Sequence, residues 1–109
     1  MRTSLRGRAL GAVLGLALLG GACVPPAPHP VPTDVPVAKR RFPDATLESL
    51  ADGRARYVSK CGGCHQLYEP ERHAPDAWPR TLDSMSARAK LTEEDRARIE
   101  QYLVTLARR

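Results

Sequence analysis

Two cysteines and a histidine stand at a spacing that supports one specific chemistry. The segment Cys61-Gly62-Gly63-Cys64-His65 has the C-x-x-C-H pattern by which c-type haem is attached to protein. Thiols three residues apart lie on one side of a helical turn, so each can add to one of the two haem vinyl groups. The adjacent imidazole then lies beneath the iron and supplies its proximal nitrogen. The motif therefore predicts one covalent haem c, bonded to Cys61 and Cys64, with His65 as an iron ligand.

Three other uses of the cysteine pair compete with haem attachment. A zinc site requires four ligands, and His73 alone does not complete the set. A thioredoxin-like redox pair belongs in a β-α-β context, and the sequence carries no strand signals. A disulfide between Cys61 and Cys64 would be strained at this separation. Haem attachment is the preferred interpretation, and the other three stay open.

An all-α domain over residues 44–109 is expected to position the motif. Apolar residues recur at helical spacing in residues 45–60, 77–89 and from Thr92 onward. Asp76 is expected to cap the second helix, and Thr92 with the acid three residues later predicts a capping box for the third. The third helix has an apolar face made of Ile99, Tyr102, Leu103 and Leu106. A domain this small usually needs a staple such as a covalent cofactor.

On these residues the chain resembles the small class I monohaem cytochromes c, as a compact variant. In that family a glycine lies eight residues before the first attachment cysteine and an aromatic residue lies four before it. Gly53 and Tyr57 occupy those places here. The family's glycine lets a C-terminal helix cross closely, and Tyr102 beside Ile99 is the counterpart. The resemblance covers roughly residues 45–107 and implies a cytochrome c-like fold of about three helices around one haem.

The resemblance also implies a methionine as the distal iron ligand. Apart from Met1, Met85 is the one methionine of the chain, and it shares a helix face with Trp78. Met85 filling the core, His73 as the ligand and an open iron position remain alternatives. Trp78 is expected to pack on the haem edge, to donate to a propionate or simply to fill the core. The family's proline carbonyl for the proximal histidine has no match, so the acceptor for the second nitrogen of His65 stays open.

The N-terminal part of the chain is expected to direct export. Residues 1–22 have a basic start and an apolar stretch typical of a signal peptide, and Cys23 follows where a bacterial lipoprotein carries its acylated cysteine. An uncleaved anchor, or ordinary cleavage after Ala22, is the alternative. The proline-rich residues 23–43 are predicted to form an extended tether without helix. The domain is therefore expected in the periplasm or at the outer face of the bacterial membrane, held by lipid.

Charge and the remaining motifs limit the classes of function. Removal of residues 1–22 leaves 14 basic and 12 acidic side chains, a net charge of +2, with no basic stripe to bind nucleic acid. No nucleophile–base pair or paired acids indicate catalysis. A monomeric single-electron carrier between a donor and an acceptor redox protein is expected. A haem sensor with an open distal site, or a haem subunit of a larger oxidoreductase, is the alternative.

Overall fold

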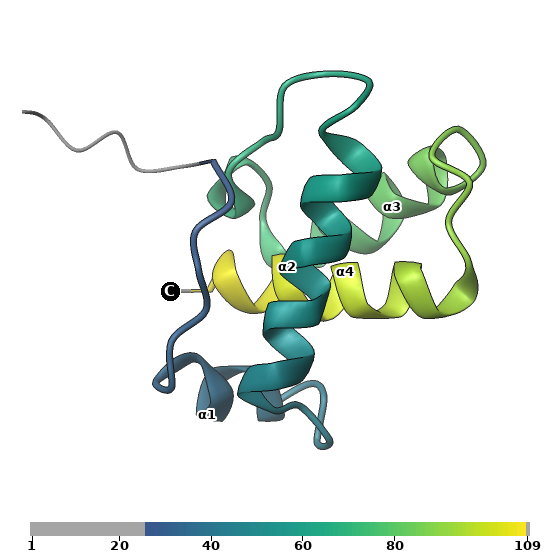
Figure 1. Ribbon diagram of the computed structural model, residues 1–109. Coiled ribbons are helices and arrows are strands. Elements are labelled where there is room, and N and C mark those ends of the chain that lie inside the picture. The colour runs from purple at the N-terminus through teal and green to yellow at the C-terminus, as the bar shows by residue number, and fades with distance from the viewer. Residues whose placement is uncertain (1–25, 109) are drawn as a thin grey trace, which may run out of the picture.

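The computed structural model describes residues 26–108, which contain four α-helices and two 3₁₀ turns joined by loops (Figure 1). In chain order they are α1 (Asp34–Lys39), α2 (Leu47–Cys61), η1 (Pro70–Arg72), η2 (Pro75–Ala77), α3 (Trp78–Ser86) and α4 (Glu93–Leu106). These residues contain no strand, which confirms the predicted all-α, cytochrome c-like fold. The predicted signal peptide and Cys23 lie outside the described residues.

The helix α2 begins and ends where its local sequence dictates. The hydroxyl of Thr46 accepts a hydrogen bond from the Ser49 amide, and the Ser49 hydroxyl accepts one from the Thr46 amide, each at 3.0 Å. This reciprocal capping satisfies amides that the first helical turn leaves unpaired. At the other end, the amide of Gly62 still donates to the Val58 carbonyl. The first attachment cysteine is therefore the last residue of α2.

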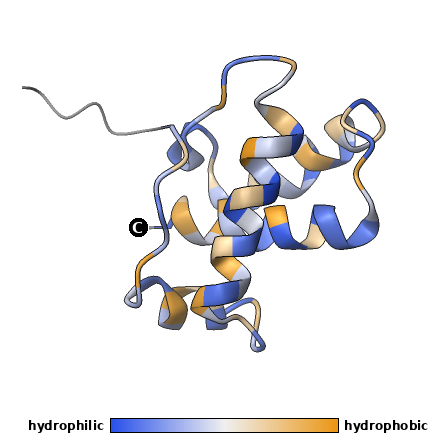
Figure 2. Cartoon of the chain, viewed as in Figure 1, coloured by the Kyte–Doolittle hydropathy of each residue, from blue (hydrophilic) through white to orange (hydrophobic). Residues whose placement is uncertain are grey.

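The helix α4 contributes more buried apolar residues than any other element, as its apolar pattern predicts. Its capping box is present, because Thr92 and Asp95 exchange hydrogen bonds of 3.0 and 3.1 Å. Hydrophilic and hydrophobic residues are interspersed along α2 and α4 (Figure 2). The buried residues of α2 share one side of that helix, whereas residues 101–106 of α4 are buried all round. The predicted apolar face of α4 is fully buried, at Ile99, Tyr102, Leu103 and Leu106.

The two helices cross in contact at Gly53. A Cβ atom placed on Gly53 would lie 2.8 Å from the Cβ of Tyr102 and would collide with the carbonyl oxygen of Arg98. Only a residue without a side chain lets the backbones approach this closely. The close approach predicted from this mid-helix glycine is confirmed.

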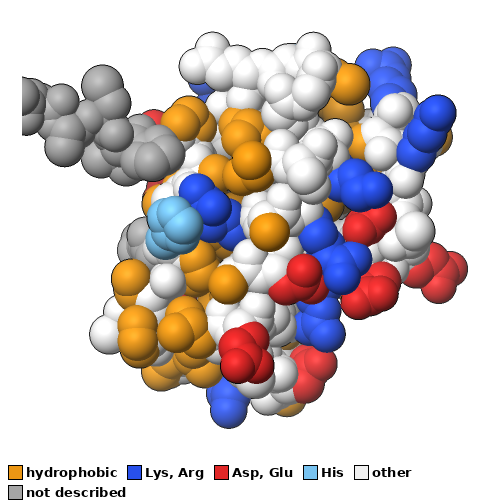
Figure 3. Space-filling view, viewed as in Figure 1, with side chains coloured by type: hydrophobic (Ala, Val, Ile, Leu, Met, Phe, Trp, Pro, Cys, Tyr) orange, Lys and Arg blue, Asp and Glu red, His pale blue; other side chains and the backbone are white. Residues whose placement is uncertain are grey.

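A charged network closes the rim of this crossing. The guanidinium of Arg56 in α2 donates to Asp52 at 3.0 Å and to Asp95 of α4 at 2.8 Å. It also pairs with Glu94, and Figure 3 shows acidic and basic side chains gathered over this side of the molecule. The backbone hydrogen bond at Thr92 and the Arg56 guanidinium together lower the pKa of Asp95 to about 2. The Asp95 carboxylate therefore stays ionised at any ordinary pH.

The segment before α2 corrects the prediction of a tether. Residues 34–39 form the helix α1, although the proline-rich run was expected to contain no helix. Its first turn is closed because the Val31 amide donates to the Asp34 carboxylate at 2.7 Å. The prolines were overestimated as helix breakers: Pro32 lies before the helix, and Pro36 falls in its first turn, where the missing N–H removes no helical bond.

This segment also belongs to the folded domain, whose predicted start at residue 44 is therefore too late. Ala27 and Ala38 are almost fully buried. The carbonyl of Ala27 accepts a hydrogen bond from Arg54 Nε, and that of Pro28 accepts one from the Tyr102 hydroxyl, both at 2.8 Å. Residues 26–43 thus form a strap over α2 and α4, and we call them the strap below.

The helix α3 also departs from its prediction at both ends. Ala77 precedes its first residue without a side-chain cap, and Asp76 instead accepts hydrogen bonds from Arg41 and Arg108. The helix ends at Ser86, before the expected residue 89. A further turn follows, in which the Ala89 amide donates to the Met85 carbonyl, and Lys90 closes this turn in a left-handed conformation with φ 52°.

The crossing at Gly53 yields a stability prediction. Gly53→Ala should destabilise the haem-loaded protein by about 1–3 kcal/mol, because the added methyl overpacks the helix contact. This loss must exceed the ~1 kcal/mol that alanine gains over glycine within a helix. Gly63→Ala is the control, since a Cβ there meets no atom within 4 Å. Denaturant unfolding measures both variants, and equal stabilities would contradict the close crossing.

Candidate haem-attachment site

The three motif residues lie at the end of α2 and in the loop that follows it. Cys61 is half-buried, whereas Cys64 and His65 are exposed. Both thiols are free, so they form no disulfide with each other. Burial, and secondarily the neighbouring Cys64, raises the pKa of the Cys61 thiol. Because neither sulfur is in a disulfide, both are available for thioether formation.

A largely apolar cavity of about 240 Å³ opens beside the motif. Its walls come from the end of α2, the following loop and the end of α3, and they consist of Lys60, Cys61, Cys64, His65, Met85, Arg88 and Ala89. A narrower cavity of about 40 Å³ shares Cys61, His65 and Met85 with it and continues inward to Tyr57, Tyr68, Trp78 and Leu103. The two cysteines, the histidine and the methionine therefore surround one apolar space.

Met85 and His73 differ in their relation to this space. Met85 lies on α3, half-buried, and lines both cavities. His73 lines neither of them and packs edge-on against Trp78, with ring centroids 4.8 Å apart. Of the two distal candidates suggested by the sequence, the geometry favours Met85.

The imidazole of His65 has a hydrogen-bond partner that leaves one nitrogen available. Its Nδ1 lies 2.8 Å from the carbonyl oxygen of Gln66, the next residue of the loop. A ligating histidine usually donates its second N–H to such an acceptor, which fixes the ring orientation. The Gln66 carbonyl is thus an acceptor of the kind that the sequence did not identify, and the contact leaves Nε2 as the nitrogen available to a metal.

Tyr57 holds the loop that carries His65. Its hydroxyl donates to the Tyr68 carbonyl at 2.6 Å and accepts from the Tyr68 amide at 3.0 Å. Burial raises the pKa of Tyr57 to about 12. The sequence placed Tyr57 only as a packing residue, because nothing in the pattern indicates what its hydroxyl contacts. The one signal available was the choice of tyrosine at a buried helix position.

Trp78 contributes to the inner wall of the site. It is buried, and its Nε1 donates to the carbonyl of Pro70 at 2.8 Å in the turn η1. Its ring lines the narrower cavity together with His65 and Met85. Its indole N–H is thus occupied by the backbone, and packing of the ring on a haem stays a prediction.

The donor set fits a covalent haem better than its rivals. Two free thiols flank an apolar space, and an imidazole and a thioether line the same space. Within residues 26–108, no group of three or more His, Cys, Asp or Glu side chains is placed to hold a metal ion. In the same range, no helix is long and apolar enough to cross a membrane.

Comparison with known families agrees with this chemistry. Residues 57–109 match the family model described as dihaem cytochrome c. This match supports a c-type cytochrome. It includes the attachment motif, α3 and α4, and it implies a covalent c-type haem in an electron carrier. Neither a curated protein nor a solved structure matches the chain. Because the matching family is dihaem, the class I monohaem resemblance and the count of one haem receive no support from it.

The hydroxyl of Tyr57 generates a prediction about the loop. Tyr57→Phe should destabilise the haem-loaded protein by about 1–3 kcal/mol, because two backbone groups of the loop lose their partner. Tyr68→Phe removes a hydroxyl from a partly exposed ring and is the matched control. Denaturant unfolding compares the two, and an equal loss in both variants would show that Tyr57 does not hold the loop.

The same hydroxyl predicts a pH dependence with a definite sign. The folded pKa of about 12 lies above the ordinary value of 10.0, so folding favours the neutral phenol. Its contribution to stability is complete below pH 10 and should be lost as the pH rises toward 12. Between pH 10 and 12, the free energy of unfolding should therefore fall more steeply for the wild type than for Tyr57→Phe. Parallel curves for the two proteins would contradict a buried, neutral Tyr57 hydroxyl.

Proposed function

We propose that this chain is a one-electron carrier that holds a single haem c through Cys61 and Cys64, with His65 and Met85 as the two axial ligands. The observation that supports the proposal is the apolar cavity that these four side chains share. A haem bound there would supply the reversible change between ferrous and ferric iron.

The protein's contribution is to hold both ligands in fixed positions. His65 is oriented by the Gln66 carbonyl, and its loop is held by Tyr57. Met85 projects from α3, which is fixed on α4 because Arg96 pairs with Asp83. A thioether ligand favours the reduced state and raises the potential. Two protein ligands also leave no coordination position for a substrate, which suits electron transfer and supports a non-enzymatic role.

The proposed count of one haem follows from the sequence. The C-x-x-C-H pattern occurs once in the 109 residues, and the third cysteine, Cys23, has no partner at this spacing. We therefore propose one haem for this chain, although the matching family is described as dihaem. One haem per chain is the count that the available thiols support.

We further propose that the carrier is exported and attached to the outer face of a bacterial membrane by acylation of Cys23. This part rests on the signal-like residues 1–22 and on the position of Cys23 directly after them. Its partners are then a donor and an acceptor redox protein in the same compartment. A monomer with no affinity for nucleic acid agrees with the balanced charge.

Replacement of the thioether tests the ligation. Met85→Leu preserves the apolar volume but removes the sulfur, so the weak far-red band of a thioether-ligated ferric haem should disappear. Reduced Met85→Leu should also bind carbon monoxide rapidly, whereas the wild type should not. His73→Gln is the control and should change neither property. If His73→Gln instead lost the far-red band and bound carbon monoxide while Met85→Leu did neither, His73 would be the distal ligand.

The same spectra decide between the carrier and a haem sensor. Rapid binding of carbon monoxide by the reduced wild type, with an unchanged spectrum in Met85→Leu, would support an open distal site. A pyridine haemochrome titration against protein mass gives the haem count. One haem per polypeptide supports the proposal, and two would contradict it.

A further inference from the structure

We propose that the lipid-bearing end of the chain holds the haem domain directly against the membrane, with the loop of residues 66–72 facing the lipid headgroups. This inference rests on the proposed acylation of Cys23. It replaces the long tether expected from the prolines with a fixed orientation, and it commits to the lipid surface as the occupant of this face.

Only a short length of chain is available between the lipid and the domain. Ala27 is 2% exposed, and its carbonyl is held by Arg54. The next carbonyl, that of Pro28, is held by Tyr102. Three residues separate Cys23 from Ala27, and an extended chain gains at most ~3.6 Å per residue, so the link spans no more than about 14 Å. A domain of this size has a radius of gyration of about 12 Å, so the link is shorter than its diameter.

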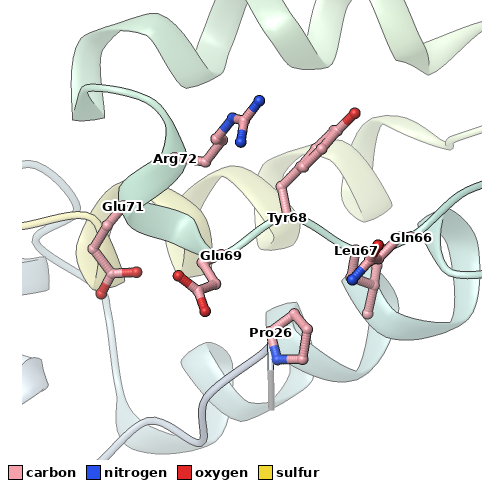
Figure 4. A pocket seen from close by; sticks show the side chains of 7 residues that line it. All are labelled: Pro26, Gln66, Leu67, Tyr68, Glu69, Glu71 and Arg72. Atoms are coloured by element: carbon pink, nitrogen blue, oxygen red, sulfur yellow. The ribbon is translucent and has the colours of Figure 1, made fainter. Parts of the chain in front are cut away.

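This link reaches the domain beside the loop that follows the haem motif. Pro26 lines a cavity of about 360 Å³ whose other walls all come from the loop after the haem motif. Figure 4 shows Pro26 opposite Leu67, Gln66 and Glu69. The other lining residues are Tyr68, Glu71 and Arg72. Figure 1 agrees, because the strap begins beside this loop while α2 starts at the opposite end of the molecule.

The charge of the loop does not account for the proposed orientation. The loop carries Glu69, Glu71 and Arg72, a mixed set without the basic cluster that attracts anionic lipid. Its apolar contribution is the Tyr68 ring, which is 43% exposed. The short covalent link, and not electrostatic attraction, is therefore what would turn this face to the membrane. The orientation should consequently not depend on the charge of the lipid.

Headgroup cross-linking tests the orientation on the full lipidated, haem-loaded protein. The protein is placed in phosphatidylcholine vesicles doped with a lipid that carries a diazirine on its headgroup. Cross-linked residues are then mapped by mass spectrometry. Cross-links should be several-fold more frequent in residues 66–72 than in residues 46–50. Residues 46–50 lie at the start of α2, and the 15 residues of this helix span about 20 Å at a rise of ~1.5 Å per residue. Vesicles doped with phosphatidylglycerol should give the same pattern.

An insertion variant is the matched control. About 20 Gly and Ser residues between Pro25 and Pro26 add a flexible span of about 25 Å without altering the domain. Cross-links in this variant should spread over both regions. If the wild type already shows equal cross-linking, the domain is not held, and the inference fails while the carrier function stands. If intact mass shows no acyl group on Cys23, the anchor and this inference both fail, whereas the haem assignment stands on its own spectrum.

Discussion

The contact between α2 and α4 at Gly53 is the constraint on which the rest of the structure depends. Because no Cβ separates the two backbones there, the ring of Tyr102 is buried against α2 and the Arg56 network closes the rim. The same contact fixes the direction in which α2 runs. Since Cys61 is the last residue of that helix, the crossing determines where the proposed first thioether would lie.

The cavity depends on two further elements, the helix α3 and the loop after α2. The helix α3 packs on α4 and brings Met85 to the space beside Cys61, while Tyr57 holds the loop after α2 by its hydroxyl. Each proposed ligand therefore comes from a segment whose position is fixed by a different contact. In the proposed electron carrier, neither ligand would have to move when the iron changes its charge.

The sequence predicted much of this arrangement where local chemistry decides the outcome. Capping at Thr92, the close approach at Gly53 and the apolar face of α4 all follow from patterns within one helix. The strap was missed because proline content indicates backbone preference but not burial, and Ala27 and Ala38 carry no pattern of their own. Contacts with carbonyl groups, such as those that Tyr57 and His65 make in the loop, were also beyond reach. A carbonyl is present at every residue, so only the fold decides which one a side chain meets.

The central claim is that a porphyrin is bonded to the end of α2 through two sulfurs. Peptide mapping by mass spectrometry, on protein produced together with haem-maturation machinery, examines that claim without reliance on activity or spectra. A proteolytic fragment containing residues 61–65 should carry the added mass of one haem that survives denaturation and acid–acetone extraction. Recovery of that fragment with unmodified thiols, from protein that has lost its red colour on extraction, would contradict the account.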